Sequence, residues 1–149
     1  MSMGNIDIIH IDSLEDPRLE AYTKLTERQL RSVLEPEKGI FIAESGKVIE
    51  RAVEAGLEPV SFLLGDRWLD QLAPLLDQLS ENRPELDIPV FVGEMGLLER
   101  LTGFSVTRGA LAAFRRPPLA DAGAFLDGLV ERAAGRPVRV CVLEGIVDH

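Results

Sequence analysis

The stretch that decides the fold is residues 40–64, IFIAESGKVIERAVEAGLEPVSFLL. It opens with a short apolar run at 40–43 and closes with another at 60–64, and both are typical of buried strands. Between them, apolar residues recur at helical spacing, as Val48, Ile49, Ala52 and Val53. We expect Ser45 to cap this helix and Gly56 to end it. The stretch therefore predicts a strand–helix–strand unit.

The same alternation continues in both directions. Strands are expected at 6–11, 88–92 and 110–114, and helices are expected to begin at Asp16–Pro17, after an N-cap at Asp66, and at Met95. Pro74 lies inside the helix begun by Asp66 and predicts a kink or a restart there. Strands that alternate with helices indicate an α/β fold with a mainly parallel sheet covered on both faces.

Composition changes at residues 115–120, RRPPLA, because Pro-Pro continues neither a helix nor a strand. A compact amphipathic helix is expected at 121–134, followed by an apolar strand at 138–143 that buries Cys141. We therefore expect a domain at 1–116, a linker at 117–120, and the helix and strand of a second unit at 121–149.

Charge and composition narrow the function classes. The chain has 149 residues, a formal net charge of −9, 46% hydrophobic residues and one cysteine. An acidic chain is repelled by phosphate backbones, so bulk charge argues against nucleic acid. His10 and His149 have no paired ligand at zinc-binding spacing. No apolar run reaches the ~18 residues of a membrane span, and no Walker loop or G-x-S-x-G elbow is present.

Basic residues nevertheless gather in two segments. Residues 18–51 carry seven of them, nearly balanced by six glutamates, and residues 104–118 carry three arginines and no acidic residue. Together these segments would make a local patch for phosphate despite the net charge. The alternative is a set of ordinary solvated surface cations.

Several motifs resemble the SpoU/TrmH family of RNA 2′-O-ribose methyltransferases. They are Ile11-Asp12-Ser13, Asp16-Pro17-Arg18, Lys24-Leu25, Arg28, Phe41-Ile42-Ala43-Glu44, Lys47–Ala52, and the run from Leu98 to Ala112. Asp16 replaces the family's usual Asn, Glu44-Ser45-Gly46 replaces its direct Glu-Gly, and Arg108 stands where Gln is common. The closing 142–149, VLEGIVDH, resembles the first strand and turn of the family's catalytic domain, just short of its N-x-G-x-x-x-R motif.

This resemblance implies an RNA-binding domain that is a three-layer α/β sandwich, similar to kink-turn-binding ribosomal proteins. It also implies a knotted catalytic domain that binds S-adenosylmethionine and forms a homodimer. The donor pocket and catalytic arginine are expected beyond residue 149, so we assign no catalytic, cofactor or metal residue in 1–149. The expected partner is rRNA or tRNA, not DNA or a membrane, and the expected location is the cytoplasm.

The resemblance also assigns roles to individual cations. The expected RNA-binding residues are Arg18, Lys24 and Arg28 near the N-terminus, Lys47 and Arg51 at a helix start, and Arg108, Arg115 and Arg116 on the second side of a groove. Glu44 is expected to orient Arg28 or to cap backbone N–H groups. Tyr22 and Trp68 are expected to pack in the core rather than to stack on bases. Two alternatives stay open: a non-enzymatic RNA-binding domain, and an acidic protein-interaction domain.

Overall fold

The computed structural model describes residues 2–3, 5–23, 39–102, 109–118 and 121–142. Lys24, Arg28, Arg108 and most of the closing motif at 142–149 lie outside these ranges. The chain divides into two compact units, Met1–Arg116 and Pro117–His149. The larger unit contains the sheet, and the smaller one contains a single described helix.

A six-stranded mixed sheet forms the centre of the larger unit, in the order β1-β2-β5-β4-β6-β3. Its strands are β1 (Ser2–Met3), β2 (Ile6–His10), β3 (Ile40–Glu44), β4 (Pro59–Gly65), β5 (Ile88–Gly93) and β6 (Ala110–Arg115). Only β2–β5 and β5–β4 pair in parallel, so the expectation of a mainly parallel sheet is wrong. The reason lies at Gly109, whose carbonyl accepts a hydrogen bond from the N–H of Gly65 at 2.8 Å. The chain therefore enters β6 beside the C-terminal end of β4, and β6 runs back antiparallel to β4.

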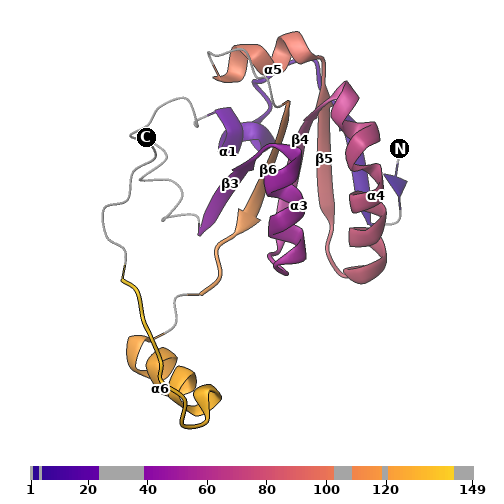
Figure 1. The fold of residues 1–149 in the computed structure, drawn as a ribbon. Coiled ribbons are helices and arrows are strands. Elements are labelled where there is room, and N and C mark those ends of the chain that lie inside the picture. The colour runs from indigo at the N-terminus through magenta and orange to yellow at the C-terminus, as the bar shows by residue number, and fades with distance from the viewer. Residues whose placement is uncertain (1, 4, 24–38, 103–108, 119–120, 143–149) are drawn as a thin grey trace. The chain divides into compact units, whose positions relative to one another are not determined.

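Helices cover both faces of this sheet, which confirms the α/β class and its three layers (Figure 1). On one face, α3 (Gly46–Glu54) and α4 (Asp66–Asn82) pack on alternate strand residues such as Phe62 and Leu64. On the other face, η1 (Pro17–Leu19), α1 (Glu20–Thr23) and α5 (Met95–Thr102) surround the intervening residue Leu63. This alternation follows from the two-residue period of a strand.

The helix starts differ from expectation in two places. Ser45 occupies the N-cap position of α3, at φ 89°, but its side chain makes no capping hydrogen bond. Asp66 is the first residue of α4, whose N-cap is Gly65. As an acidic residue in the first turn, Asp66 still stabilises the positive end of the helix dipole.

Pro74 does not end or restart α4, which continues as one helix from Asp66 to Asn82. A proline inside a helix costs about 3 kcal/mol relative to alanine. Leu72, Leu76 and Leu79 are all buried on the same side of α4. Burying each such side chain contributes about 1.5–3 kcal/mol. Their combined burial outweighs the cost of the proline, so the helix persists.

Tyr22 confirms the expectation of core packing. Its side chain is fully buried, and its hydroxyl lies 2.7 Å from Oγ of Ser61 and accepts a hydrogen bond from the N–H of Ala113 at 3.2 Å. Burial raises the pKa of the Tyr22 phenol well above its usual range. The phenol therefore joins α1 to β4 and β6 in its neutral form.

The smaller unit contains α6 (Ala122–Ala133), capped by the carboxylate of Asp121, which accepts from the N–H of Ala124 at 3.0 Å. No residue of α6 is buried, and Phe125 is 49% and Val130 63% exposed. Residues 138–142 form no strand, which corrects the expected strand at 138–143 over its described part. A strand needs a neighbour for its N–H and C=O groups, and the described part of this unit contains none. Cys141 is accordingly exposed rather than buried.

Candidate nucleic-acid interface

Five of the eight expected RNA-binding cations lie in described residues, and all five are exposed: Arg18, Lys47, Arg51, Arg115 and Arg116. The other three, Lys24, Arg28 and Arg108, lie outside the described residues, as does the expected pairing of Glu44 with Arg28. The structure distributes the five over different parts of the larger unit. They therefore do not form the single groove that the sequence suggested.

Arg18 lies on the α1/α5 face of the sheet. Its Nη2 is 2.6 Å from Oδ2 of Asp16, and its Nε donates to both carboxylate oxygens. Its guanidinium also lies 5.2 Å from the ring centre of Phe91, within reach of a cation–π interaction. The hydrogen bonds raise the pKa of Arg18 and lower that of Asp16. Asp16 thus already occupies two of the three guanidinium nitrogens of Arg18.

Lys47 and Arg51 lie on the opposite face, on the first and second turns of α3. The strand register separates them from Arg115, because Glu44 at the end of β3 faces Leu111 while Ile40 at its start faces Arg115. Four residues of strand correspond to about 13 Å. Lys47 and Arg115 therefore lie at opposite ends of the strands.

Two arginines contact Glu58 at the end of the sheet where β6 finishes, and a third, Arg116, follows directly after that strand. Nε of Arg115 lies 2.5 Å from Glu58, and Nη2 of Arg83 lies 3.8 Å from the other oxygen of the same carboxylate. Arg116 donates from Nε to the carbonyl of Ile40 at 3.0 Å. We call Arg83, Arg115 and Arg116 the arginine edge. Arg83 was not among the expected residues, although a cation that follows a helix C-terminus is a recognisable signal.

At the opposite end of the strands, the indole of Trp68 packs between two glycines. A Cβ atom at Gly46 would lie 2.6 Å from Cζ3 of Trp68, and one at Gly109 would lie 2.6 Å from its Nε1. Real Cβ atoms do not approach this closely, so both positions require glycine. Trp68 is partly buried against the α3/α4 core, as its expected packing role requires.

This contact joins the start of α3 to the start of β6. Lys47 follows Gly46 directly, and the exposed Arg67 precedes Trp68 on α4. We call Lys47, Arg67 and Trp68 the tryptophan edge. The indole holds the first turn of α3 in place, so the position of Lys47 at the positive end of that helix is defined by packing. Sequence spacing alone does not reveal this contact.

The described residues contain no group of three or more His, Cys, Asp or Glu side chains that could hold a metal ion. None of the helices in the described ranges is long and apolar enough to cross a membrane.

Comparison with known proteins relates the chain to enzymes that act on RNA. It is 29% identical over 144 residues to a Mycobacterium bovis protein described as an uncharacterized tRNA/rRNA methyltransferase, covering 97% of this chain and 45% of that protein. A Mycobacterium tuberculosis protein of the same description is 28% identical over 144 residues. The chain thus spans less than half the length of these relatives. No family model matches it.

Solved structures agree on the fold. An AdoMet-bound rRNA methyltransferase from Sinorhizobium meliloti superposes with a TM-score of 0.53 at 16% identity, covering 75% of this chain and 38% of that one. A second structure of rRNA methyltransferase from the same organism gives a TM-score of 0.52, also at 16% identity, covering 78% of this chain and 39% of that one. These structures show that the chain has an α/β fold also found in rRNA methyltransferases, and the sequence matches relate the chain to RNA methyltransferases. More particularly, this chain is homologous to part of the mycobacterial tRNA/rRNA methyltransferases.

Proposed function

We propose that residues 1–116 are the RNA-recognition domain of an S-adenosylmethionine-dependent RNA 2′-O-ribose methyltransferase of the SpoU/TrmH family, and that residues 121–149 begin its catalytic domain. The homology carries this proposal, because it extends over 97% of the chain, and thus over both units, while covering 45% of the relatives. The expected substrate is rRNA or tRNA, and the expected assembly is a homodimer.

The tryptophan edge is our candidate for the RNA contact. Lys47 lies in the first turn of α3, where free N–H groups and the helix dipole favour a phosphate. Arg51 lies one turn further along α3, and Arg67 is exposed on the first turn of α4. The arginine edge is a weaker candidate, because Glu58 and Glu85 already contact Arg83 and Arg115.

We assign donor binding to the part of the enzyme beyond this chain. S-adenosylmethionine carries an α-carboxylate that needs a cationic or N–H partner. The groove between α3 and α4 holds one cation, Arg83, whose Nε is 2.5 Å from Glu85. Two carboxylates, Glu50 and Glu54, line the same groove, so it does not fit the donor's carboxylate. Titration calorimetry of residues 1–149 should detect no donor binding, and micromolar affinity would contradict this assignment.

RNA binding by the chain tests the proposal. We expect a short labelled single-stranded RNA to bind with a log–log salt slope of roughly −2 to −3, as three or four phosphate contacts give. The double variant Lys47→Glu/Arg51→Glu should flatten this slope. The variant Arg115→Glu/Arg116→Glu makes the same charge change at the other end of the strands and should affect the slope less.

The chain contains a single tryptophan, so its fluorescence reports on the tryptophan edge directly. RNA bound there should change the emission of Trp68 in the wild type. If RNA does not bind even at low salt, the RNA role of these residues is wrong, and the acidic protein-interaction domain becomes the better reading.

A further inference from the structure

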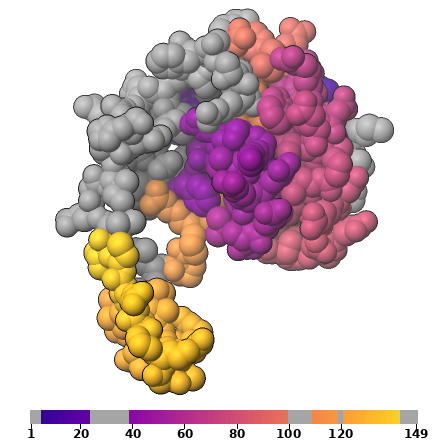
Figure 2. All heavy atoms as spheres, viewed as in Figure 1, coloured from indigo at the N-terminus to yellow at the C-terminus, as the bar shows by residue number. Residues whose placement is uncertain are grey.

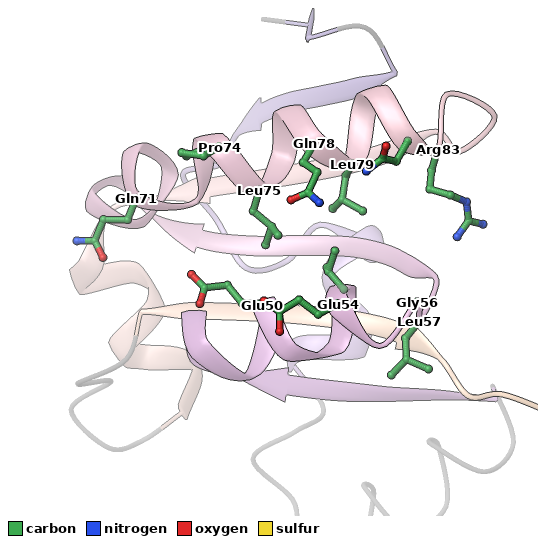
Figure 3. A pocket seen from close by; sticks show the side chains of 12 residues that line it. Glu50, Glu54, Gly56, Leu57, Gln71, Pro74, Leu75, Gln78, Leu79 and Arg83 are labelled. Carbon is green, nitrogen blue, oxygen red and sulfur yellow. The ribbon is translucent and has the colours of Figure 1, made fainter.

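A groove of about 590 Å³ lies between α3 and α4 (Figure 3), the two helices that lie side by side on the face shown in Figure 2. Along α4 its lining runs from Gln71 to Asn82. At 1.5 Å per residue, this is about 16 Å of helix. An extended peptide of about five residues spans the same length. The groove therefore has the size for a short segment, not for a folded domain.

The α3 wall of this groove is acidic. Glu50 and Glu54 are exposed and one helical turn apart, and both line the groove from α3 (Figure 3). Neither carboxylate forms an ion pair with another residue in the described ranges. Arg83, at the far end, is held by Glu85 at 2.5 Å and Glu58 at 3.8 Å. The groove thus attracts a cation and repels the phosphates of RNA.

The rest of the lining limits what kind of cation fits. The partly buried Leu75 of α4 presents apolar surface between the walls, and the largely buried Leu79 lies beside it. Gln71, Gln78 and Asn82 add three carboxamides, which both donate and accept hydrogen bonds. A peptide backbone matches such groups with its own C=O and N–H. A protonated polyamine offers donors but no acceptor, so it matches only the oxygen atoms of these carboxamides.

We infer that this groove binds a short segment of a partner protein in which basic and aliphatic residues alternate. Residues i and i+2 of an extended chain lie on one side, about 6.5–7 Å apart. That distance matches two carboxylates one helical turn apart, about 6 Å. The intervening aliphatic residues then face Leu75 and Leu79. This inference does not depend on the proposed RNA role.

The test uses the whole chain and a fluorescein-labelled peptide, acetyl-Lys-Leu-Lys-Leu-Lys-amide, followed by anisotropy at about 150 mM salt, where longer-range attraction is screened. The isosteric double variant Glu50→Gln/Glu54→Gln should weaken binding about five- to tenfold. This estimate assumes two exposed ion pairs of ordinary strength. A peptide with Glu in place of Lys should not bind.

The matched control is Asp77→Asn/Glu81→Gln, which removes the same charge from an exposed pair one turn apart on α4 that does not line the groove. It should change affinity less than twofold. If both double variants weaken binding equally, the attraction is general and the inference is wrong. If spermidine displaces the peptide at equal concentration, the site takes polyamines instead. If wild-type protein does not bind the peptide at millimolar concentration, the groove is not a docking site.

Discussion

The hydroxyl of Tyr22 lies between two buried partners, Oγ of Ser61 and the N–H of Ala113. Tyr22→Phe removes the hydroxyl, so both buried groups lose a hydrogen-bond partner. We expect a loss of about 1–3 kcal/mol in the free energy of unfolding, measured by urea denaturation. Tyr22→Phe/Ser61→Ala should lose less than the sum of the single changes, because one orphaned group is removed. If Tyr22→Phe leaves the free energy of unfolding unchanged, the hydroxyl does not stabilise the fold.

The same tyrosine gives the stability a pH dependence. Its pKa is raised by burial in the folded state, whereas an unfolded tyrosine has a pKa of about 10. Above that pH the unfolded chain releases the proton first, so it binds fewer protons than the folded chain and stability falls as pH rises. The slope should approach about 1.4 kcal/mol per pH unit. The chain has one tyrosine, so Tyr22→Phe should lack this component in urea titrations from pH 9 to 11.

Two helical glycines should respond oppositely to alanine. At Gly46 a Cβ would lie 2.6 Å from the indole of Trp68, whereas at Gly96 it would meet no atom within 4 Å. Gly46→Ala should therefore destabilise the protein by about 1–3 kcal/mol through overpacking. Gly96→Ala should stabilise it by about 0.5–1 kcal/mol. Thermal melting of both variants checks this, and equal shifts would contradict the packing of Trp68.

At the scale of elements, α4 continues through a proline that it does not need for packing. Pro74 is exposed, so replacing it removes no buried contact. Pro74→Ala restores a backbone N–H and should stabilise the protein by about 1–3 kcal/mol, as read from the urea midpoint. Ala73→Pro, at the neighbouring position, should have the opposite sign. A destabilised Pro74→Ala would mean that the ring contributes to α4 in another way.

Helices and strands of the larger unit were predictable because each depends on local periodicity. The run at 88–92, for example, is β5 (Ile88–Gly93), extended by one residue. Sheet order was not predictable, since the antiparallel return of β6 depends on the distant contact between Gly65 and Gly109. The strand expected at 138–143 was wrong over 138–142 because apolar content alone supplies no pairing partner.

The candidate site was predictable only in composition. Sequence identified Lys47, Arg115 and Arg116 as exposed cations, but register placed them at opposite ends of the strands. The contact between Trp68 and its two glycines joins three separate parts of the chain. Glu50 and Glu54 look like ordinary helix surface until α4 lies beside them. In each case the missing information is a long-range contact.

At the scale of the whole molecule, α6 is exposed along its apolar side, with Phe125 at 49%, Leu126 at 45% and Val130 at 63%. Leaving such side chains in water forfeits about 1.5–3 kcal/mol each relative to full burial. We therefore expect the 149-residue chain to self-associate. Light scattering should give a larger mass for it than for a version ending at Pro118.

The variant Phe125→Ser/Val130→Lys controls for chain length, and it should behave like the shortened version. If the full chain and the version ending at Pro118 have monomeric masses at the same concentration, residues 119–149 do not mediate association.

The pairing of β2 with β5 and of β3 with β6 has a consequence during synthesis. Ile8 pairs with Val90, and Ile42 with Ala113, so the two earliest long strands have partners that the ribosome makes much later. At about 5–20 residues per second, each strand waits roughly 4 to 16 s for its neighbour. During that interval its apolar side chains and free backbone groups are open to other nascent chains. Translation speed and chaperone supply, rather than final stability, should therefore limit the yield of folded protein.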